Sequence, residues 1–130
     1  MILNEGGNIF KDPNGQIATR RINKADVSPT IAWLEQVTGL PLATNTLGTT
    51  GIAPTSGDID IAVDQNKISK DELADKLTQW AVKNKQDPKQ WVKKSGISVH
   101  FKTPIKGSAN NGYVQTDLMF GDPEWMKWSL

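Results

Sequence analysis

The chain has 130 residues, 37% of them hydrophobic, and its 15 basic and 14 acidic residues give a net charge of +1. This length predicts one compact domain spanning residues 1–130, and the balanced charge gives no reason to expect a polyanion or a membrane as partner. The absence of cysteine excludes disulfides and thiolate chemistry. Because no stretch has the pattern of a signal peptide or a membrane span, we expect a soluble cytoplasmic protein.

The N-terminal part predicts an irregular segment followed by one helix. Residues 1–17 are rich in Asn, Gly, Asp and Pro, which is typical of an irregular arm outside the core. Ser28 before Pro29 resembles a helix start, and apolar residues recur at helical spacing until Gly39. A short strand is expected over residues 42–47.

The second half predicts strands around one further helix. An irregular turn rich in Gly and Thr, residues 48–57, comes first, and Ser69 with Glu72 fits the capping box of a helix start. The alternation of apolar and polar residues predicts strands over residues 58–63, 97–102 and 113–120. The element order predicts an α/β (α+β) fold, a small mixed β-sheet with helices packed on one face.

Two carboxylates interrupt the strand over residues 58–63. Asp58 and Asp60 point to the same side of that strand, with Cα atoms about 6.5 to 7 Å apart from the usual rise per residue. Asp117 interrupts another apolar run, VQTDLMF. Three acids on neighbouring strands can share a pair of divalent ions, and oxygen-only ligation suits Mg²⁺ or Mn²⁺.

The turn before this strand offers groups that bind phosphate. Gly48 and Gly51 allow the backbone to approach a ligand closely, and the hydroxyls of Thr49, Thr50 and Ser56 can bind phosphate oxygens together with backbone N–H groups. Gly57, directly before Asp58, belongs to the same candidate site. A phosphate-binding turn beside a carboxylate pair indicates a metal-bound nucleotide.

This combination resembles the DNA polymerase beta-like nucleotidyltransferases. In that family a Gly-Ser turn precedes an Asp-x-Asp pair at a strand start, and a third acid follows on a neighbouring strand. The matching residues here, in the range 47–120, are Gly48-Thr49, Asp58 with Asp60, and Asp117. Thr49 replaces the usual Ser and keeps its hydroxyl. The C-terminal domain of larger members has no counterpart, and the compact size is similar to that of phage-encoded members.

The resemblance implies a nucleotidyltransferase that uses two Mg²⁺ or Mn²⁺ ions and an NTP such as ATP. Asp58 and Asp60 would hold both ions, and Asp117 would hold the catalytic ion and help to activate the acceptor. The enzyme would transfer a nucleoside monophosphate to a hydroxyl of RNA, protein or a small molecule and release pyrophosphate. A phage-encoded member would act in the host cytoplasm.

Other interpretations remain open from the sequence. The chain can be a non-catalytic nucleotide- or protein-binding module of the same fold, antitoxin-like or an accessory subunit, or a structural protein whose acids lie on a solvated sheet face. Asp117 can instead pair with a buried Lys or Arg. His100 is expected to face outward, but a role as catalytic base stays open because its strand is expected to lie beside that of Asp117. Candidates for binding phosphates or an acidic acceptor are Arg20, Arg21, Lys102 and Lys106, although Arg20 and Arg21 can instead lie on a solvated face. Trp125 and Trp128 in the C-terminal tail suggest contact with another subunit or a further domain.

Overall fold

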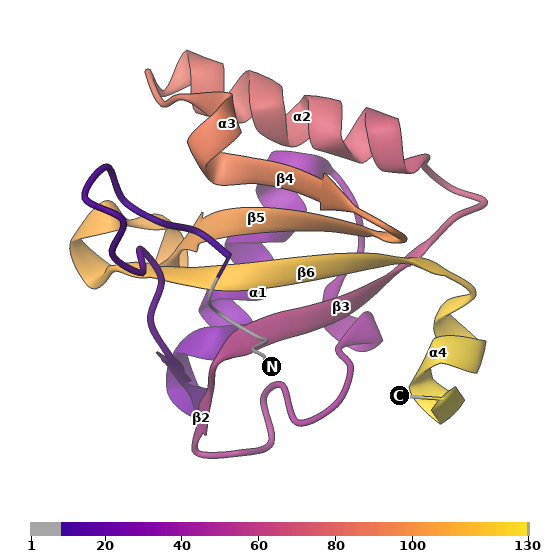
Figure 1. The fold of residues 1–130 in the computed structure, drawn as a ribbon. Coiled ribbons are helices and arrows are strands. Elements are labelled where there is room, and N and C mark those ends of the chain that lie inside the picture. Colours follow the sequence, from indigo (N-terminus) through magenta and orange to yellow (C-terminus); the bar gives the residue numbers. More distant parts are fainter. Residues whose placement is uncertain (1–8, 130) are drawn as a thin grey trace.

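A four-stranded mixed sheet lies at the centre of the computed structural model, which describes residues 9–129 (Figure 1). The strands are β1 (Ile22–Asn23), β2 (Thr55–Ser56), β3 (Asp58–Asp64), β4 (Val92–Ser95), β5 (Ser98–Pro104) and β6 (Tyr113–Gly121). The helices are α1 (Lys24–Thr38), α2 (Lys70–Lys83), α3 (Pro88–Trp91) and α4 (Pro123–Ser129). Short 3-10 turns lie at Ala43–Asn45, Ile105–Gly107 and Ala109–Asn111. The described part of the chain therefore has the α+β character that the sequence predicts.

The sheet has the strand order β3-β6-β5-β4. β3 and β6 pair in parallel, with Asp60 opposite Asp117, whereas β5 pairs antiparallel with both β6 and β4. The short strands β1 and β2 form a separate antiparallel pair beside the start of β3. Two strands that are far apart in sequence, β3 and β6, are thus direct neighbours in the sheet.

Both long helices, α1 and α2, pack against the same face of the sheet. Alternate residues of the strands point to this face, and their apolar side chains meet the apolar stripes of the helices. The main contributors to this core are Ile59, Ile61, Val63, Val99, Phe101 and Leu118 from the sheet, Val27, Ile31 and Leu34 from α1, and Leu73, Leu77 and Ala81 from α2. The other face of β3, β6 and β5 carries mainly polar side chains, apart from a small apolar cluster that includes Ala62 and Met119.

The helix starts differ in how well the sequence predicts them. The capping box of α2 is confirmed: the Ser69 hydroxyl accepts a hydrogen bond from the backbone N–H of Glu72, and the Glu72 carboxylate accepts one from that of Ser69. The predicted start of α1 at Ser28 is wrong, because the helix begins at Lys24 and contains Pro29. The Lys24 N–H donates to the Pro54 carbonyl at 3.0 Å, so a tertiary contact fixes the helix start.

The predicted strand over residues 42–47 is also wrong. Ala43–Asn45 forms a 3-10 turn, and only Thr46 makes a bridge, to Ile61. The Glu35 carboxylate accepts hydrogen bonds from the backbone N–H groups of Leu42 at 2.8 Å and Ala43 at 3.1 Å. These bonds hold the segment in a turn, because its N–H groups are directed at a side chain rather than at a neighbouring strand.

The N-terminal arm is part of the folded structure from residue 9 onward, and residues 1–8 lie outside the described residues. Lys11 and Ile17 form a β-bridge, and the Ala18 N–H donates to the Phe10 carbonyl at 2.8 Å. Phe10 is 0% exposed, with the Lys93 ammonium 5.8 Å from its ring centroid. The expectation that the whole arm lies outside the core is therefore wrong for Phe10.

Two polar segments contain elements that the sequence did not predict. Residues 84–94 include α3 and most of β4, which forms the edge strand beside β5. The C-terminal tail forms α4, whose Met126 is buried against Ala62 and Met119 on the second face of the sheet. Trp125 and Trp128 on this helix are 68% and 90% exposed.

None of the helices within residues 9–129 combines the length and hydrophobicity that crossing a bilayer requires.

Replacement of Phe10 tests whether the arm contributes to stability. We expect Phe10→Ala to lower the free energy of unfolding by about 3–5 kcal/mol, the usual loss for a buried Phe. The control, Ile17→Ala, changes a side chain of the same arm that is 50% exposed and should shift stability by less than about 0.5 kcal/mol. Urea denaturation followed by tryptophan fluorescence measures both changes. Equal stabilities of the two variants would show that the arm does not contribute to the fold.

Candidate functional site

Three carboxylates meet on the face of the sheet opposite α1 and α2. Asp58 and Asp60 lie on β3 and point to the same side, and Asp117 lies beside Asp60 on the parallel strand β6. One carboxylate oxygen from each of the three lies within 4.8 Å of the other two. The three acids that the sequence singled out are therefore brought to one point by the register of β3 and β6.

The surroundings make two of these acids hard to ionise. Burial raises the pKa of Asp60 to about 8, and the negative charges of Asp58 and Asp117 add to this effect. Burial and the charge of Asp117 likewise raise the pKa of Asp58 to about 6, while the positive charge of Arg21 partly opposes them. At neutral pH the cluster thus carries less negative charge than three free carboxylates, unless a cation binds to it.

Asp117 behaves differently because it accepts hydrogen bonds from two neighbours. Burial acts to raise its pKa, but hydrogen bonds from His100 and Gln115 outweigh burial and hold the pKa below its usual value. The His100 Nδ1 lies 2.6 Å from Asp117 Oδ1, and the Gln115 Nε2 donates to the same oxygen at 2.9 Å. Asp117 is therefore the member of the cluster that is most stable as a carboxylate.

The donor set of this cluster fits a divalent cation. Three carboxylate oxygens within a few ångströms of one another match the oxygen ligands that Mg²⁺ and Mn²⁺ prefer, and neither thiolate nor a group of imidazoles is present to favour a softer metal. A cation would also relieve the mutual repulsion that raises the pKa of Asp58 and Asp60.

The Gly- and Thr-rich turn lies along the edge of β3. The Leu47 N–H donates to the Asp60 carbonyl at 2.8 Å, and the Asp60 N–H donates to the Thr50 hydroxyl at 3.1 Å. Gly48 has a φ of 61°, which suits a glycine. Thr49 is exposed, whereas Thr50 and Gly48 line a cavity of about 350 Å³ toward α1. The turn is thus attached to the strand that carries Asp60, although none of the three acids lines that cavity.

Ser56 and Gly57 connect β2 to β3, immediately before Asp58. Ser56 is buried, and among residues 9–129 its hydroxyl has no hydrogen-bond partner. The guanidinium of Arg21 lies over Gly57, where a Cβ atom would come within 3.3 Å of Nη1. Arg21 Nε also donates to the Thr55 hydroxyl at 3.0 Å, which holds the guanidinium next to the start of β3.

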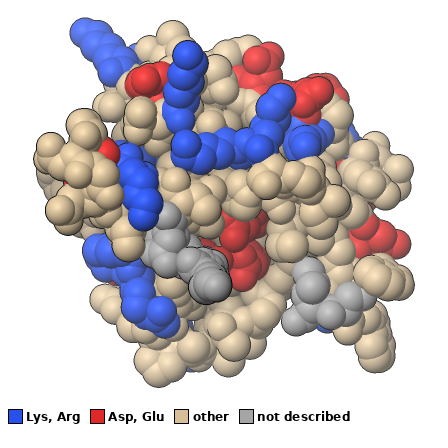
Figure 2. Space-filling view, in the orientation of Figure 1, with Lys and Arg blue, Asp and Glu red and all other residues tan. Residues whose placement is uncertain are grey.

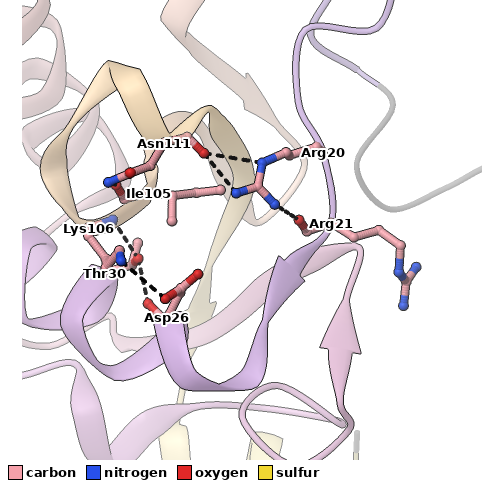
Figure 3. Close-up of polar contacts among 7 residues, drawn as sticks. All are labelled: Arg20, Arg21, Asp26, Thr30, Ile105, Lys106 and Asn111. Atoms are coloured by element: carbon pink, nitrogen blue, oxygen red, sulfur yellow. Dashed lines mark hydrogen bonds and ion pairs between the residues drawn. The ribbon is translucent and has the colours of Figure 1, made fainter.

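The two neighbouring arginines have different roles (Figure 3). Arg20 donates from Nε and Nη2 to the Asn111 carbonyl at 3.2 and 2.8 Å, and from Nη1 to the Arg21 carbonyl at 2.7 Å. Its donors thus hold the loop between β5 and β6. Arg21 points away from this loop in Figure 3, and its charge acts on Asp58. Of the two, Arg21 is the one that belongs to the acidic cluster.

The two lysines that the sequence offered as phosphate ligands are engaged elsewhere. The Lys106 ammonium forms an ion pair with Asp26 on α1 at 3.4 Å, and its backbone N–H donates to the Thr30 hydroxyl (Figure 3). The Lys102 ammonium lies 4.7 Å from the ring centroid of Trp91 and 4.5 Å from that of Tyr113. Burial lowers the pKa of Lys102. These cation–π contacts favour a position of the ammonium beside the two rings.

Charged side chains are unevenly distributed on this face (Figure 2). An acidic patch lies near the middle of the view, and Lys and Arg side chains lie above it and to its left. The register gives one reason: Asp60 and Asp117 continue across the sheet into His100 on β5 and Lys93 on β4. The sheet thus changes from acidic to basic along a single row of paired residues.

Sequence reasoning missed the two residues that contact Asp117. His100 lies on the polar face of the sheet rather than in the core, and on that face it contacts Asp117. The signal for Gln115 was its position two residues before Asp117 on the same strand, which places both side chains on one face.

Comparison of the chain with family models, curated proteins and solved structures gave no match.

The cluster predicts a pH dependence of the metal-free protein. An unfolded Asp has a pKa of about 3.9, whereas that of folded Asp60 is about 8. Between these two pKa values the folded state binds more protons than the unfolded state. The free energy of unfolding is therefore highest below about pH 3.9 and falls progressively as the pH rises through about 8. Urea denaturation in EDTA at pH 5 and pH 9 measures this. Asp60→Asn should reduce the loss of stability between pH 5 and pH 9, whereas the control Asp75→Asn, at an exposed position, should leave it unchanged. Equal stability of the wild type at both pH values would contradict the prediction.

Proposed function

We propose that this protein is a metal-dependent nucleotidyltransferase. It would transfer a nucleoside monophosphate from an NTP to an acceptor hydroxyl and release pyrophosphate. The observation that supports this most is the convergence of Asp58, Asp60 and Asp117 within 4.8 Å, beside a Gly- and Thr-rich turn that is attached to β3. Oxygen ligands for divalent ions next to a candidate phosphate-binding turn are what phosphoryl transfer requires.

In this proposal the three acids have separate tasks. Asp58 and Asp60 would hold the metal ions, and Asp117 would join them as a ligand and help to activate the acceptor hydroxyl. When bound, the ions would neutralise the triphosphate and stabilise the attacking and leaving oxygens of an in-line displacement. The acceptor hydroxyl loses its proton to solvent as its oxygen bonds to the α-phosphorus, the bond from this phosphorus to the bridging oxygen breaks, and pyrophosphate leaves with that electron pair.

Arg21 is the cation that we assign to the triphosphate. Its guanidinium is held by Thr55 and lies over Gly57, next to Asp58. A fixed guanidinium presents several donors to phosphate oxygens without further ordering of the side chain. Gly57 leaves room for this guanidinium, since any larger residue would have its Cβ atom 3.3 Å from Nη1.

Substitution of the acids tests the proposed chemistry. Asp58→Asn and Asp60→Asn should each reduce pyrophosphate release to the level seen without metal, because each removes a ligand charge. Both variants should fold at least as stably as the wild type in EDTA, since one source of repulsion is gone. The matched control is Asp64→Asn, which changes an acid further along β3 that lies outside the cluster. Full activity of either cluster variant would refute the assignment.

The same assay separates transfer from binding alone. Incubation with Mn²⁺ and each labelled NTP in turn measures nucleotide binding, and release of labelled pyrophosphate measures transfer. Binding without release, with a panel of RNA, protein and small hydroxyl acceptors, would indicate a nucleotide-binding module. Absence of both would indicate that the acids only occupy a polar sheet face.

The assignment of Arg21 has its own test. Arg21→Gln should raise the KM for the NTP by about tenfold to a hundredfold, the equivalent of losing charged hydrogen bonds worth about 1.5–3 kcal/mol. The kcat should change less than the KM, since the triphosphate is bound in both the ground and the transition state. Lys24→Gln removes an exposed charge three residues away and serves as control. An unchanged KM in Arg21→Gln would exclude the role.

A further inference from the structure

The carboxylate of Asp117 is held by two side chains that belong to different strands. His100 lies on β5 directly opposite Asp117, and its Nδ1 is 2.6 Å from Oδ1. Gln115 precedes Asp117 by two residues on β6, and its Nε2 donates to the same oxygen at 2.9 Å. Both hydrogen bonds end on Oδ1, so they fix the rotation of the carboxylate and leave Oδ2 outside both bonds.

The orientation of Gln115 is itself fixed. Its side-chain carbonyl Oε1 accepts a hydrogen bond from the Ile9 backbone N–H at 3.3 Å, and the residue is only 2% exposed. Because the carbonyl end of the amide is used by Ile9, the NH₂ end must face Asp117. The hydrogen-bond chain from Ile9 through Gln115 to Asp117 is therefore directional.

Such support matters most where like charges are close. Asp58 and Asp60 each have a carboxylate oxygen within 4.8 Å of one of Asp117, and their repulsion acts to turn Asp117 away. Two donors on one oxygen of Asp117 oppose this rotation before any ion is bound. Hydrogen bonds to a metal-ligating carboxylate orient it in the same way, and their loss commonly reduces metal affinity by about 10–100-fold.

We propose that His100 and Gln115 are positioning residues that hold the Asp117 carboxylate in the orientation required to bind the same divalent ion as Asp58 and Asp60. This inference rests on the proposed function, since it assumes that the cluster binds such an ion. Neither residue is assigned as a metal ligand. Their task is to keep the Asp117 carboxylate oriented before an ion binds. Ion binding then does not have to include the cost of ordering this side chain.

Titration with Mn²⁺, followed by electron paramagnetic resonance of the free ion, tests this on the full chain without nucleotide. His100→Leu removes the donor and replaces the imidazole with an apolar side chain of similar size. We expect the Mn²⁺ affinity of this variant to fall by about tenfold or more. His100→Asn returns an N–H donor near the position of Nδ1 and should recover most of the affinity. Gln115→Met removes the second donor and should weaken binding independently. Ser98→Ala, two residues before His100 on the same face of β5, is the matched control.

The outcomes separate this inference from the function on which it rests. If the wild type binds no Mn²⁺, the metal site and the positioning role are both overturned. If the wild type binds Mn²⁺ and both His100→Leu and Gln115→Met bind it equally well, only the positioning role is overturned. Thermal unfolding in EDTA controls for folding. A reduced Mn²⁺ affinity supports the positioning role when the variant has the same melting temperature as Ser98→Ala. Failure of His100→Asn to recover affinity while Gln115→Met binds normally would also overturn the role.

Discussion

The parallel pairing of β3 with β6 is the constraint on which the site depends. In this register Asp60 lies opposite Asp117, and the alternation of side chains along β3 adds Asp58 to the same face. Three carboxyl groups are thereby placed close together, and burial and mutual repulsion oppose the ionisation of Asp58 and Asp60. The apolar residues between them, such as Ile59, are buried on the opposite face and fix this register. The stability of the core thus maintains an arrangement of acids that is unfavourable in the absence of a cation.

Much of the fold could be predicted where local pattern and tertiary structure agree. The alternation of Ile59 and Ile61 with acids predicts β3, and the capping box at Ser69 predicts the start of α2. Prediction was wrong where a distant contact decides the local structure. The start of α1 depends on a hydrogen bond from Lys24 to Pro54, and the burial of Phe10 depends on packing by residues far along the chain. Neither contact leaves a periodic signal in the sequence.

In the candidate site, too, some residues could be predicted from local pattern and others depend on distant contacts. The three acids could be identified because each interrupts an apolar strand, which is an unfavourable place for an isolated charge. The pairing of His100 with Asp117 could not, because it depends on the relative register of β5 and β6. Arg20 and Arg21 are adjacent and chemically identical, yet one holds a loop and the other lies beside Asp58. Only the direction in which each side chain leaves the backbone separates their roles.

The order in which the chain is synthesised has a consequence for how the sheet assembles. Among the strands in residues 9–129, β6 is synthesised last, yet it lies between β3 and β5 in the middle of the sheet. Until it is made, β3 has no neighbour in this sheet, and the edges that β6 will join are unpaired. A nascent chain therefore exposes apolar strand surface until β6 has been synthesised, and chaperone binding is useful up to that point. Completion of the sheet and assembly of the acidic cluster become one event.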